Sequence, residues 1–176
     1  MEYKIKINNL KTEDGKLIEK DLKKIDNLYE GQIIKGIVTG IKPYGAFVKM
    51  ENGMSALVHI EDMSVARIKS PSERLEIGQK ASFVVKSIDR KSSRVLLSYK
   101  EILGSWEENA KKFKEGATVT GIAREIEKCK NGIFIELTPN LVGLAEYKEG
   151  IEYGQNVNVY IKRIIPEKKK VKLIIV

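Results

Sequence analysis

The sequence predicts an all-β protein in which one small unit is written twice, with a short helix between the copies. Apolar residues alternate in short runs, and turns containing Gly or Asn separate these runs, as is typical of strands. The motifs of the first half recur in the same order in the second half. A capping-box spacing followed by an apolar stripe lies between the two copies. Strands this short fit a small barrel or a sandwich.

The length and composition exclude several classes of protein. The 176 residues are 42% apolar and 32% charged, which is enough apolar material for a core and argues against wholesale disorder. The single cysteine, Cys129, excludes an intramolecular disulfide and a CxxC metal site. The single histidine, His59, excludes multi-histidine metal chemistry. We therefore expect no metal and no other cofactor.

The same sequence predicts no membrane partner. No apolar run approaches the roughly 20 residues that a membrane helix needs, and the first seven residues are too polar for a signal peptide. A single cysteine suits a reducing compartment. We expect a cytoplasmic protein.

The internal repeat is visible at five places along the chain. Each motif of the first copy has a counterpart in the second with the same glycine or the same apolar alternation. The matched pairs are Gly31–Val38 with Gly116–Ala123, Gly45–Met50 with Gly132–Leu137, Leu57 with Leu144, Gly78–Val85 with Gly154–Ile161, and Arg94–Leu97 with Lys170–Leu173.

In the first copy, alternation predicts strands near 32–41, 45–50, 56–60, 80–88 and 94–98. The stretch 61–77 is predicted to be an irregular loop with one helical turn. Leu57 precedes Gly78 by 21 residues, whereas Leu144 precedes Gly154 by 10, so this loop is shorter in the second copy.

The predicted organisation has four parts. Residues 1–27 have a strand-like start and a predicted helix near 17–26, and the sequence does not indicate their function. The other three parts are the first unit, the linker helix and the second unit, at 28–100, 101–115 and 116–176. In the linker, Ser105 and Glu108 have the capping-box spacing. Trp106, Ala110 and Phe113 then share one helix face, which we expect to pack against a barrel, and Gly116 is predicted to end the helix.

Positive charge is concentrated in the two units. The net charge is +8; residues 28–100 carry 12 basic and 7 acidic side chains, and residues 116–176 carry 10 and 7. Such an excess attracts polyanions, although solubility alone would also explain it.

One outward surface of the first unit collects aromatic and basic residues. Alternation sends Ala46, Val48 and Met50 to the core and therefore Phe47 outward. The same rule on neighbouring strands and turns predicts one surface formed by Tyr44, Phe47, His59 and Arg94, with Lys42, Lys49 and Arg90 nearby. Exposed aromatic residues can also serve only to pack across strands. Several aromatic residues beside cations, however, favour binding of a single-stranded nucleic acid, because its bases stack on rings and its phosphates attract positive charge.

The run from Gly31 to Lys100 resembles the S1 domain, an RNA-binding module. The resemblance rests on Gly31-x-x-x-x-Gly36-x-Val38, Ile41-x-x-Tyr44-Gly45-Ala46-Phe47-Val48, Leu57-Val58-His59-Ile60, Gly78-Gln79, Ile88-Asp89 and Arg94-Val95-x-Leu97-Ser98-x-Lys100. It implies a five-stranded antiparallel barrel of the OB-fold class that binds single-stranded RNA. It also implies RNA-facing positions at Tyr44, Phe47, His59, Asp89 and Arg94, of which Asp89 comes from the resemblance alone.

The second unit is similar to the same domain but departs from it at the binding face. Phe134 keeps its aromatic character. The replacements are Asn131 for Tyr44, Glu146 for His59, Ile165 for Asp89 and Lys170 for Arg94. We expect weaker RNA binding here, with Phe134 and Lys170 as the candidates, and a structural or protein-contacting role. The order of barrel, helix and degenerate barrel resembles bacterial S1-like RNA-binding proteins.

No motif in the sequence predicts catalysis. There is no GxxxxGK[ST] loop, and Gly36, Gly40 and Gly45 do not fit GxGxxG. Glu61 and Asp62 are adjacent at a strand end and would point to opposite faces. Cys129 has no histidine in its own unit and is interpreted as a loop cysteine. We therefore expect no catalytic residues.

The sequence thus predicts single-stranded RNA binding by the first unit, in translation or RNA metabolism. Ribosomal and RNA-processing proteins are further partners that the resemblance leaves open. The first alternative is a protein-interaction adaptor on the ribosome or an RNA-processing complex, which would not need the aromatic surface. The second is a non-catalytic part of a larger RNA-processing enzyme.

Overall fold

The computed structural model describes residues 25–126 and 131–176. The predictions for residues 1–24 and for Cys129 lie outside the described residues. The chain divides into two compact units: residues up to 59 together with 75–98, and residues 60–74 together with 99–176. No helix in the described ranges has the length and apolar character needed to cross a bilayer.

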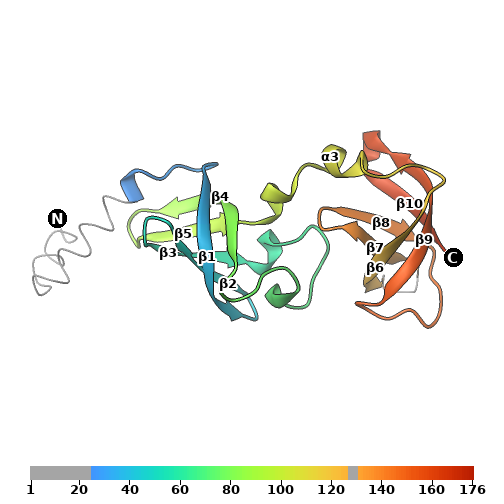
Figure 1. Ribbon diagram of the computed structural model, residues 1–176, viewed down its shortest axis with the longest axis horizontal. Helices are drawn as coiled ribbons and strands as arrows, with labels where there is room; N and C mark the ends of the chain where they lie inside the picture. Colours follow the sequence, from blue (N-terminus) through green and yellow to red (C-terminus); the bar gives the residue numbers. More distant parts are fainter. Residues whose placement is uncertain (1–24, 127–130) are drawn as a thin grey trace, which may run out of the picture. The chain divides into compact units, whose positions relative to one another are not determined.

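The first unit contains one closed five-stranded barrel (Figure 1). Its strands lie within about a residue of the predicted bounds: β1 (Ile33–Lys42), β2 (Gly45–Met50), β3 (Ser55–His59), β4 (Lys80–Asp89) and β5 (Arg94–Ser98). The order around the barrel is β1-β2-β3-β5-β4. Four neighbouring pairs are antiparallel, and the pair that links β3 to β5 is parallel. This is the topology of the OB fold, which confirms the predicted fold class.

The predicted inward residues form the core of this barrel. Ala46, Val48, Val58 and Leu97 are fully buried, and Phe83 of β4 is the largest side chain among them. Because side chains alternate along a strand, their neighbours Phe47, Leu57 and Leu96 must face outward.

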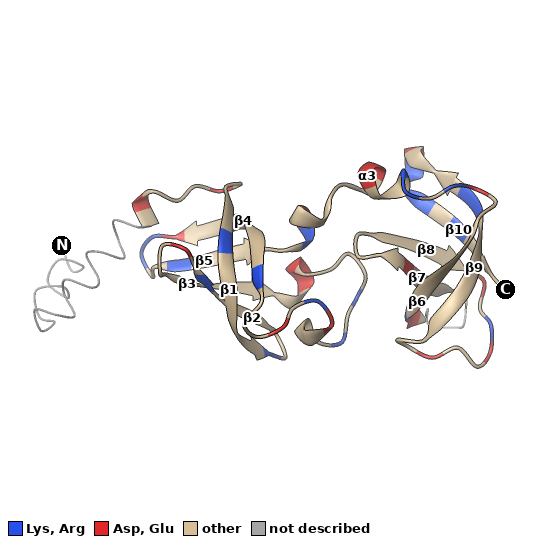
Figure 2. Cartoon of the chain, in the orientation of Figure 1, with Lys and Arg blue, Asp and Glu red and all other residues tan. Residues whose placement is uncertain are grey.

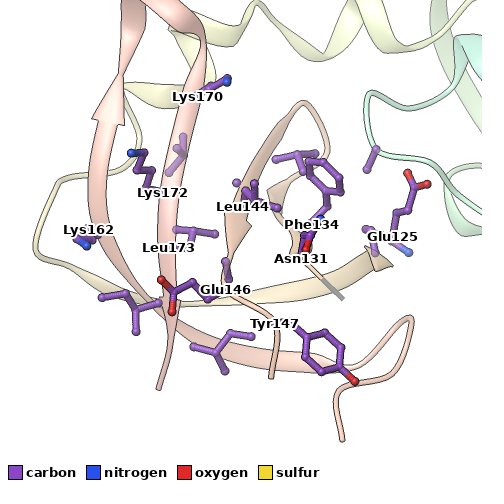
Figure 3. Close-up of a pocket in the computed structure, with 18 of the residues that line it drawn as sticks. Glu125, Asn131, Phe134, Leu144, Glu146, Tyr147, Lys162, Lys170, Lys172 and Leu173 are labelled. Atoms are coloured by element: carbon purple, nitrogen blue, oxygen red, sulfur yellow. The ribbon is translucent and has the colours of Figure 1, made fainter. Parts of the chain in front are cut away.

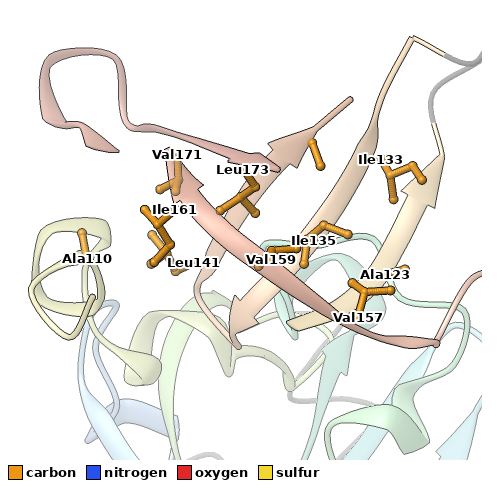
Figure 4. Packing of buried hydrophobic residues seen from close by; sticks show 11 residues of the cluster. Ala110, Ala123, Ile133, Ile135, Leu141, Val157, Val159, Ile161, Val171 and Leu173 are labelled. Atoms are coloured by element: carbon orange, nitrogen blue, oxygen red, sulfur yellow. The ribbon is translucent and has the colours of Figure 1, made fainter. Parts of the chain in front are cut away.

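The second unit repeats this barrel with the same circular order. Its strands are β6 (Thr118–Ile126), β7 (Ile133–Thr138), β8 (Leu141–Ala145), β9 (Asn156–Ile165) and β10 (Lys170–Ile175). Here β8 and β10 form the parallel pair, as β3 and β5 do in the first barrel. Figure 4 shows its core, in which Ile133, Ile135, Leu141, Val159 and Ile161 are fully buried.

The linker carries the predicted cap but a shorter helix. Ser105 Oγ accepts from the Glu108 N–H at 3.1 Å, and Glu108 Oε2 accepts from the Ser105 N–H at 2.9 Å, so both bonds of the capping box are present. Helix α3 (Trp106–Ala110) ends well before Gly116, because the next N–H groups bond to carbonyls three residues back. Trp106, Ala110 and Phe113 pack on the second barrel's core, as predicted.

The segment 60–74 belongs to the second unit, although it lies between β3 and β4 in the sequence. It contains two short 3-10 helices, η1 (Ile60–Asp62) and η2 (Pro71–Glu73), where a single helical turn was predicted. Ser70 caps η2 with a capping box of its own, and Glu73 supplies the return bond. The extra length of the first repeat therefore forms ordered structure.

Candidate nucleic-acid interface

The centre of the outward surface of the first barrel is a row of apolar side chains across β2, β3 and β5. Phe47 pairs with Leu57 across β2 and β3, and Leu57 pairs with Leu96 across β3 and β5. On the other side of Phe47 stands Gly40 of β1. All three apolar side chains are half-buried, so each presents one side to a ligand while its base packs on the sheet.

Tyr44 extends this row with a second ring. It lies in the β1–β2 turn and is 51% exposed. Its ring centroid is 6.3 Å from that of Phe47, and the two ring planes are nearly perpendicular, at 88°. Edge-to-face packing of this kind favours a fixed ring geometry. The predicted pair of aromatic groups is therefore brought together.

His59 lies at the same end of the surface as Tyr44. It pairs directly with Gly45, the residue that follows Tyr44. A Cβ on Gly45 would approach the Val58 carbonyl oxygen to 2.3 Å and the His59 Cα to 3.2 Å. Only glycine therefore lets β2 and β3 approach closely enough to set His59 beside the aromatic pair.

Arg94 lies at the opposite end, because β3 and β5 run parallel. His59 is two residues beyond Leu57, whereas Arg94 is two residues before Leu96, the partner of Leu57. At a rise of about 3.3 Å per residue, the two positions are separated by about 13 Å along the strands. Four predicted residues and two leucines thus form a stripe, here called the aromatic face: Tyr44, Phe47, His59 and Arg94, with Leu57 and Leu96 between them.

Two exposed lysines flank the aromatic face. Lys42 pairs with Gly45 at the β1–β2 turn, and Lys49 stands two residues beyond Phe47 on β2. Within the described part of the chain, neither these lysines nor Arg94 forms an ion pair. Their charges are therefore available to a phosphate.

The other two predicted residues make contacts within the fold. Asp89 pairs with Arg94 at the base of the β4–β5 hairpin. Its carboxylate accepts hydrogen bonds from the side chain and backbone N–H of Ser92 and from the N–H of Lys91, and these bonds hold the pKa of Asp89 below its usual range. Asp89 thus fixes the turn from which Arg94 projects.

Arg90 holds the segment that precedes β1. Its Nη1 donates to the Ile25 carbonyl at 3.1 Å and pairs with Asp26 at 3.2 Å, and its Nη2 donates to the Leu28 carbonyl at 3.2 Å. Sequence reasoning missed this role, because the partners lie more than 60 positions away.

The second barrel keeps the geometry of the face but changes its chemistry. Phe134 pairs with Leu144, and Leu144 pairs with Lys172, so this row corresponds to Phe47, Leu57 and Leu96. Asn131 and Glu146 are exposed at the positions of Tyr44 and His59. The second surface therefore keeps one ring and places a lysine where the first has a leucine.

Buried charges occur in the second unit at a place that the sequence analysis did not single out. Glu136 has a side chain that is 3% exposed and accepts from Arg74 and from Arg124, the latter at 2.9 Å. Arg74 also donates to Ser64 at 2.9 Å. Burial disfavours the charge on Arg124, but the carboxylate of Glu136 outweighs this and raises the pKa of Arg124. Two buried cations thus share one buried anion.

Glu73 and Tyr153 complete this ionic cluster. Glu73 accepts from Arg124 at 3.2 Å and from the Tyr153 hydroxyl at 2.8 Å. Burial opposes ionisation of Glu73, but the bonds from Tyr153, Lys69 and Ser70 outweigh it, so the pKa of Glu73 is lowered. Burial and the neighbouring carboxylate raise the pKa of Tyr153. The ionic cluster therefore binds the 60–74 segment to β6 and β7.

In the ranges 25–126 and 131–176, no three His, Cys, Asp or Glu side chains come together in a way that could hold a metal ion. The fold and the aromatic face define the class of protein: it has two OB-type barrels, one of which presents an exposed and a half-buried ring between cations.

Comparison with known proteins identifies the domain of the first unit and relatives of the chain. Residues 28–100 match the model of the S1 RNA binding domain. The chain is 32% identical to small ribosomal subunit protein bS1 of Staphylococcus aureus over 97% of its own length and 49% of the relative's. It is 30% identical to the bS1 protein of Rhizobium meliloti over 85% of its own length and 28% of the relative's. Residues 28–100 are therefore an S1 RNA binding domain, and the chain spans about half the length of the Staphylococcus aureus relative.

Among solved structures, the chain is similar to GSP13 from Bacillus subtilis. The identity is 25%, the match covers 51% of this chain and 75% of the other, and the TM-score is 0.43.

Proposed function

We propose that this protein binds single-stranded RNA through the aromatic face of its first barrel, without catalysing a reaction. The observation that carries the proposal is the perpendicular pair of the exposed Tyr44 and the half-buried Phe47, which lies between cations that make no ion pair in the described structure. Unpaired bases stack on such rings, and the phosphates between them interact with Lys42, Lys49 and Arg94. The match of residues 28–100 to the S1 RNA binding domain supports the same partner.

The proposed roles differ along the face. Phe47, Tyr44 and His59 contact bases, whereas Arg94 and the two lysines contact phosphates. Asp89 and Arg90 act as positioning residues, because their side chains are engaged by the hairpin turn and by segment 25–28. The similarity to ribosomal protein bS1 supports a cytoplasmic role in translation, with the ribosome as a further partner.

The first test compares single-stranded with duplex RNA of the same length. We expect the intact protein to bind the single strand more tightly, since stacking needs unpaired bases. Equal affinity for both would overturn the proposal and leave charge as the only attraction.

The second test separates stacking from charge. Phe47→Ala should weaken binding by about 1–3 kcal/mol per base stacked, with the salt dependence unchanged. Arg94→Ala should weaken binding and also reduce the slope of log affinity against log salt by about 0.7, the contribution of one phosphate on a single strand. Tyr160→Ala is a matched ring control, because Tyr160 is an exposed aromatic residue on β9 of the other unit. If Phe47→Ala binds as Tyr160→Ala does, RNA does not use this face.

A protein-interaction adaptor is the second candidate function, and the surface of the second barrel favours it. The exposed carboxylate of Glu146 beside the exposed Leu144 suits a protein partner better than a base. An adaptor does not need the aromatic face, so retention of partner binding together with loss of RNA binding in Phe47→Ala would separate the two functions.

A further inference from the structure

In the second barrel, the inserted segment 60–74 covers a patch of the outward surface. The covered positions belong to the ionic cluster: Arg124 of β6, Glu136 of β7 and Tyr153, which precedes β9. Two further contacts surround the cluster. The Lys69 ammonium lies 4.3 Å from the centroid of the Tyr153 ring, and Arg67 pairs with Glu125 at 3.5 Å, beside the pocket shown in Figure 3. This patch is therefore a surface on which a protein segment docks.

The first barrel has the same patch at equivalent backbone positions. Ile37 of β1 pairs with Lys49 of β2, as Ile122 of β6 pairs with Glu136 of β7. The glycine before β4 donates to a carbonyl of β1 at 2.7 Å, and the glycine before β9 donates to the equivalent carbonyl of β6 at the same distance. The equivalent residues, here called the docking patch of the first barrel, are Ile37 for Ile122, Thr39 for Arg124, Lys49 for Glu136 and Ile77 for Tyr153.

Within the described ranges, the docking patch of the first barrel is uncovered. Ile77 is 67% exposed and Ile37 is 40% exposed, whereas their counterparts Tyr153 and Ile122 are half-buried. The two polar positions of the patch are exposed in the first barrel and buried in the second. Large aliphatic side chains that are exposed where the second barrel is covered indicate a binding surface.

Positive charge surrounds Ile37 in this patch. Lys80 pairs with Ile37 across β4 and β1, and Lys49 pairs with it across β2 and β1. Lys35 stands two residues before Ile37 and therefore faces the same side of β1 (basic residues are blue in Figure 2). None of these lysines forms an ion pair with a described residue. They line a hollow over β1 together with one carboxylate, Glu51. An aliphatic centre between three cations favours an occupant with acidic and apolar groups.

An acidic protein segment fits the docking patch better than RNA or a second copy of the chain does. The patch has no aromatic ring on which a base could stack, and its aliphatic side chains suit a protein. On the second barrel, Arg74 docks on Glu136, but Lys49 occupies that position on the first barrel. Arg74 of a second copy would therefore meet a like charge. The segment that matches the patch carries a carboxylate where this chain has Arg74.

We infer that the docking patch binds an acidic segment of a partner protein, in the place that segment 60–74 takes on the second barrel. The inference goes beyond the proposed function and does not depend on RNA binding, because the patch contains neither ring of the aromatic face. Lys49 borders both surfaces, so a bound partner takes one cation from the RNA and does not occupy Tyr44 or Phe47.

The test measures the binding of two synthetic peptides to the full chain by fluorescence anisotropy. One peptide has the sequence of residues 60–74, and the other carries Arg74→Glu. We expect the Arg74→Glu peptide to bind more tightly by about fivefold, as an exposed charge pair allows. Lys49→Glu in the chain should reverse this preference, because it restores the charge of Glu136 at that position. Ile37→Ser should weaken peptide binding, whereas the control Ile174→Ser, at a 44%-exposed isoleucine on β10, should not.

Equal binding of the two peptides, or binding of neither, would overturn the inference, as would equal effects of Ile37→Ser and Ile174→Ser. Self-association of the wild type in sedimentation velocity that Ile37→Ser abolishes would also overturn it and assign the patch to a second copy. Loss of oligouridylate binding in Lys35→Gln/Lys80→Gln, with peptide binding unchanged, would assign the patch to RNA instead. Failure of the proposed function is read separately, from RNA binding by Phe47→Ala, because Phe47 lies outside the patch.

Discussion

Lys49 and Glu136 occupy the same position in the two repeats, yet one side chain is solvated and the other is buried. Each stands two residues after the phenylalanine of its outward face. The difference arises because the first repeat carries the longer segment 60–74, which folds into the second unit and brings Arg74 to Glu136 and Glu73 to Arg124. An outward position on a strand therefore becomes a core position when a distant segment covers it.

The outward faces of the two barrels also differ in chemistry, although their strands pair in the same way. Both barrels pair a phenylalanine with a leucine across the same two strands. The first face adds a second ring, a histidine and a leucine, whereas the second adds an amide, a carboxylate and a lysine. The same backbone arrangement thus presents groups for base stacking in the first barrel and mainly charged groups in the second.

The largest effect is expected from the buried carboxylate. Glu136→Ala leaves Arg74 and Arg124 buried without their shared anion, and breaking a buried pair in this way costs about 3–5 kcal/mol. The single tryptophan, Trp106, packs on the second barrel's core, so its fluorescence during denaturant unfolding reports on this unit. Lys49→Ala, at the corresponding exposed position, should change stability by less than about 0.5 kcal/mol. Equal unfolding midpoints for the two variants would show that the ionic cluster contributes nothing.

The next effect concerns the two phenylalanines. Phe47→Ala should cost about 1–3 kcal/mol in RNA affinity per base stacked, and Phe134→Ala less than that, because Phe134 has no second ring beside it. Binding isotherms of both full-length variants at one salt concentration check this. Point substitution is used because cutting the chain would remove segment 60–74 from its unit. A larger loss from Phe134→Ala would reverse the roles of the two barrels.

The third prediction uses the titration of Glu73. Its pKa is lowered in the folded state, so its ionised form stabilises the second unit. This stabilisation is complete above the unfolded pKa, about 4.3 for a glutamate, and is lost as the pH falls through the lower folded value. The midpoint of thermal unfolding, followed by Trp106 fluorescence, should be lower in Glu73→Gln than in wild type at neutral pH. The two midpoints should converge as the pH falls below about 4. If the difference between the two unfolding midpoints does not change with pH, the destabilisation comes from lost packing and not from the charge of Glu73.

The smallest effect is expected from Glu146, the exposed carboxylate at the position of His59 on the second barrel. Glu146→Gln removes a negative charge that repels RNA phosphates. It should therefore raise the affinity for long single-stranded RNA about twofold to fivefold at low salt. The gain should disappear at high salt, because Glu146 is exposed and its charge is screened. Glu149→Gln is the matched control, because Glu149 is exposed three residues further on and does not line the same pocket as Glu146. An equal gain in affinity for Glu149→Gln would show that the effect comes from the net charge of the protein and not from the position of Glu146.

The sequence by itself determined what depends on neighbouring residues. Period-two alternation placed Ala46 and Val48 in the core and Phe47 outside, because successive side chains on a strand must point to opposite faces. The spacing of Ser105 and Glu108 predicted both bonds of the cap, since a capping box needs only four consecutive residues. The repeat predicted two barrels of the same topology, because the same pattern of apolar residues and turns specifies the same strands.

Only the tertiary structure decided where the long-range polar contacts form. Arg90 was predicted to lie near the RNA-facing surface, and only the structure shows that its guanidinium also holds segment 25–28. Glu136 follows the outward pattern of its strand and is buried because Arg74, 62 positions away, covers it. Hydrogen bonds and ion pairs of this kind depend on which segments meet in space. Local periodicity does not predict contacts between distant segments. It specifies the face of a strand or helix on which a side chain lies, but not the segment that packs against that face.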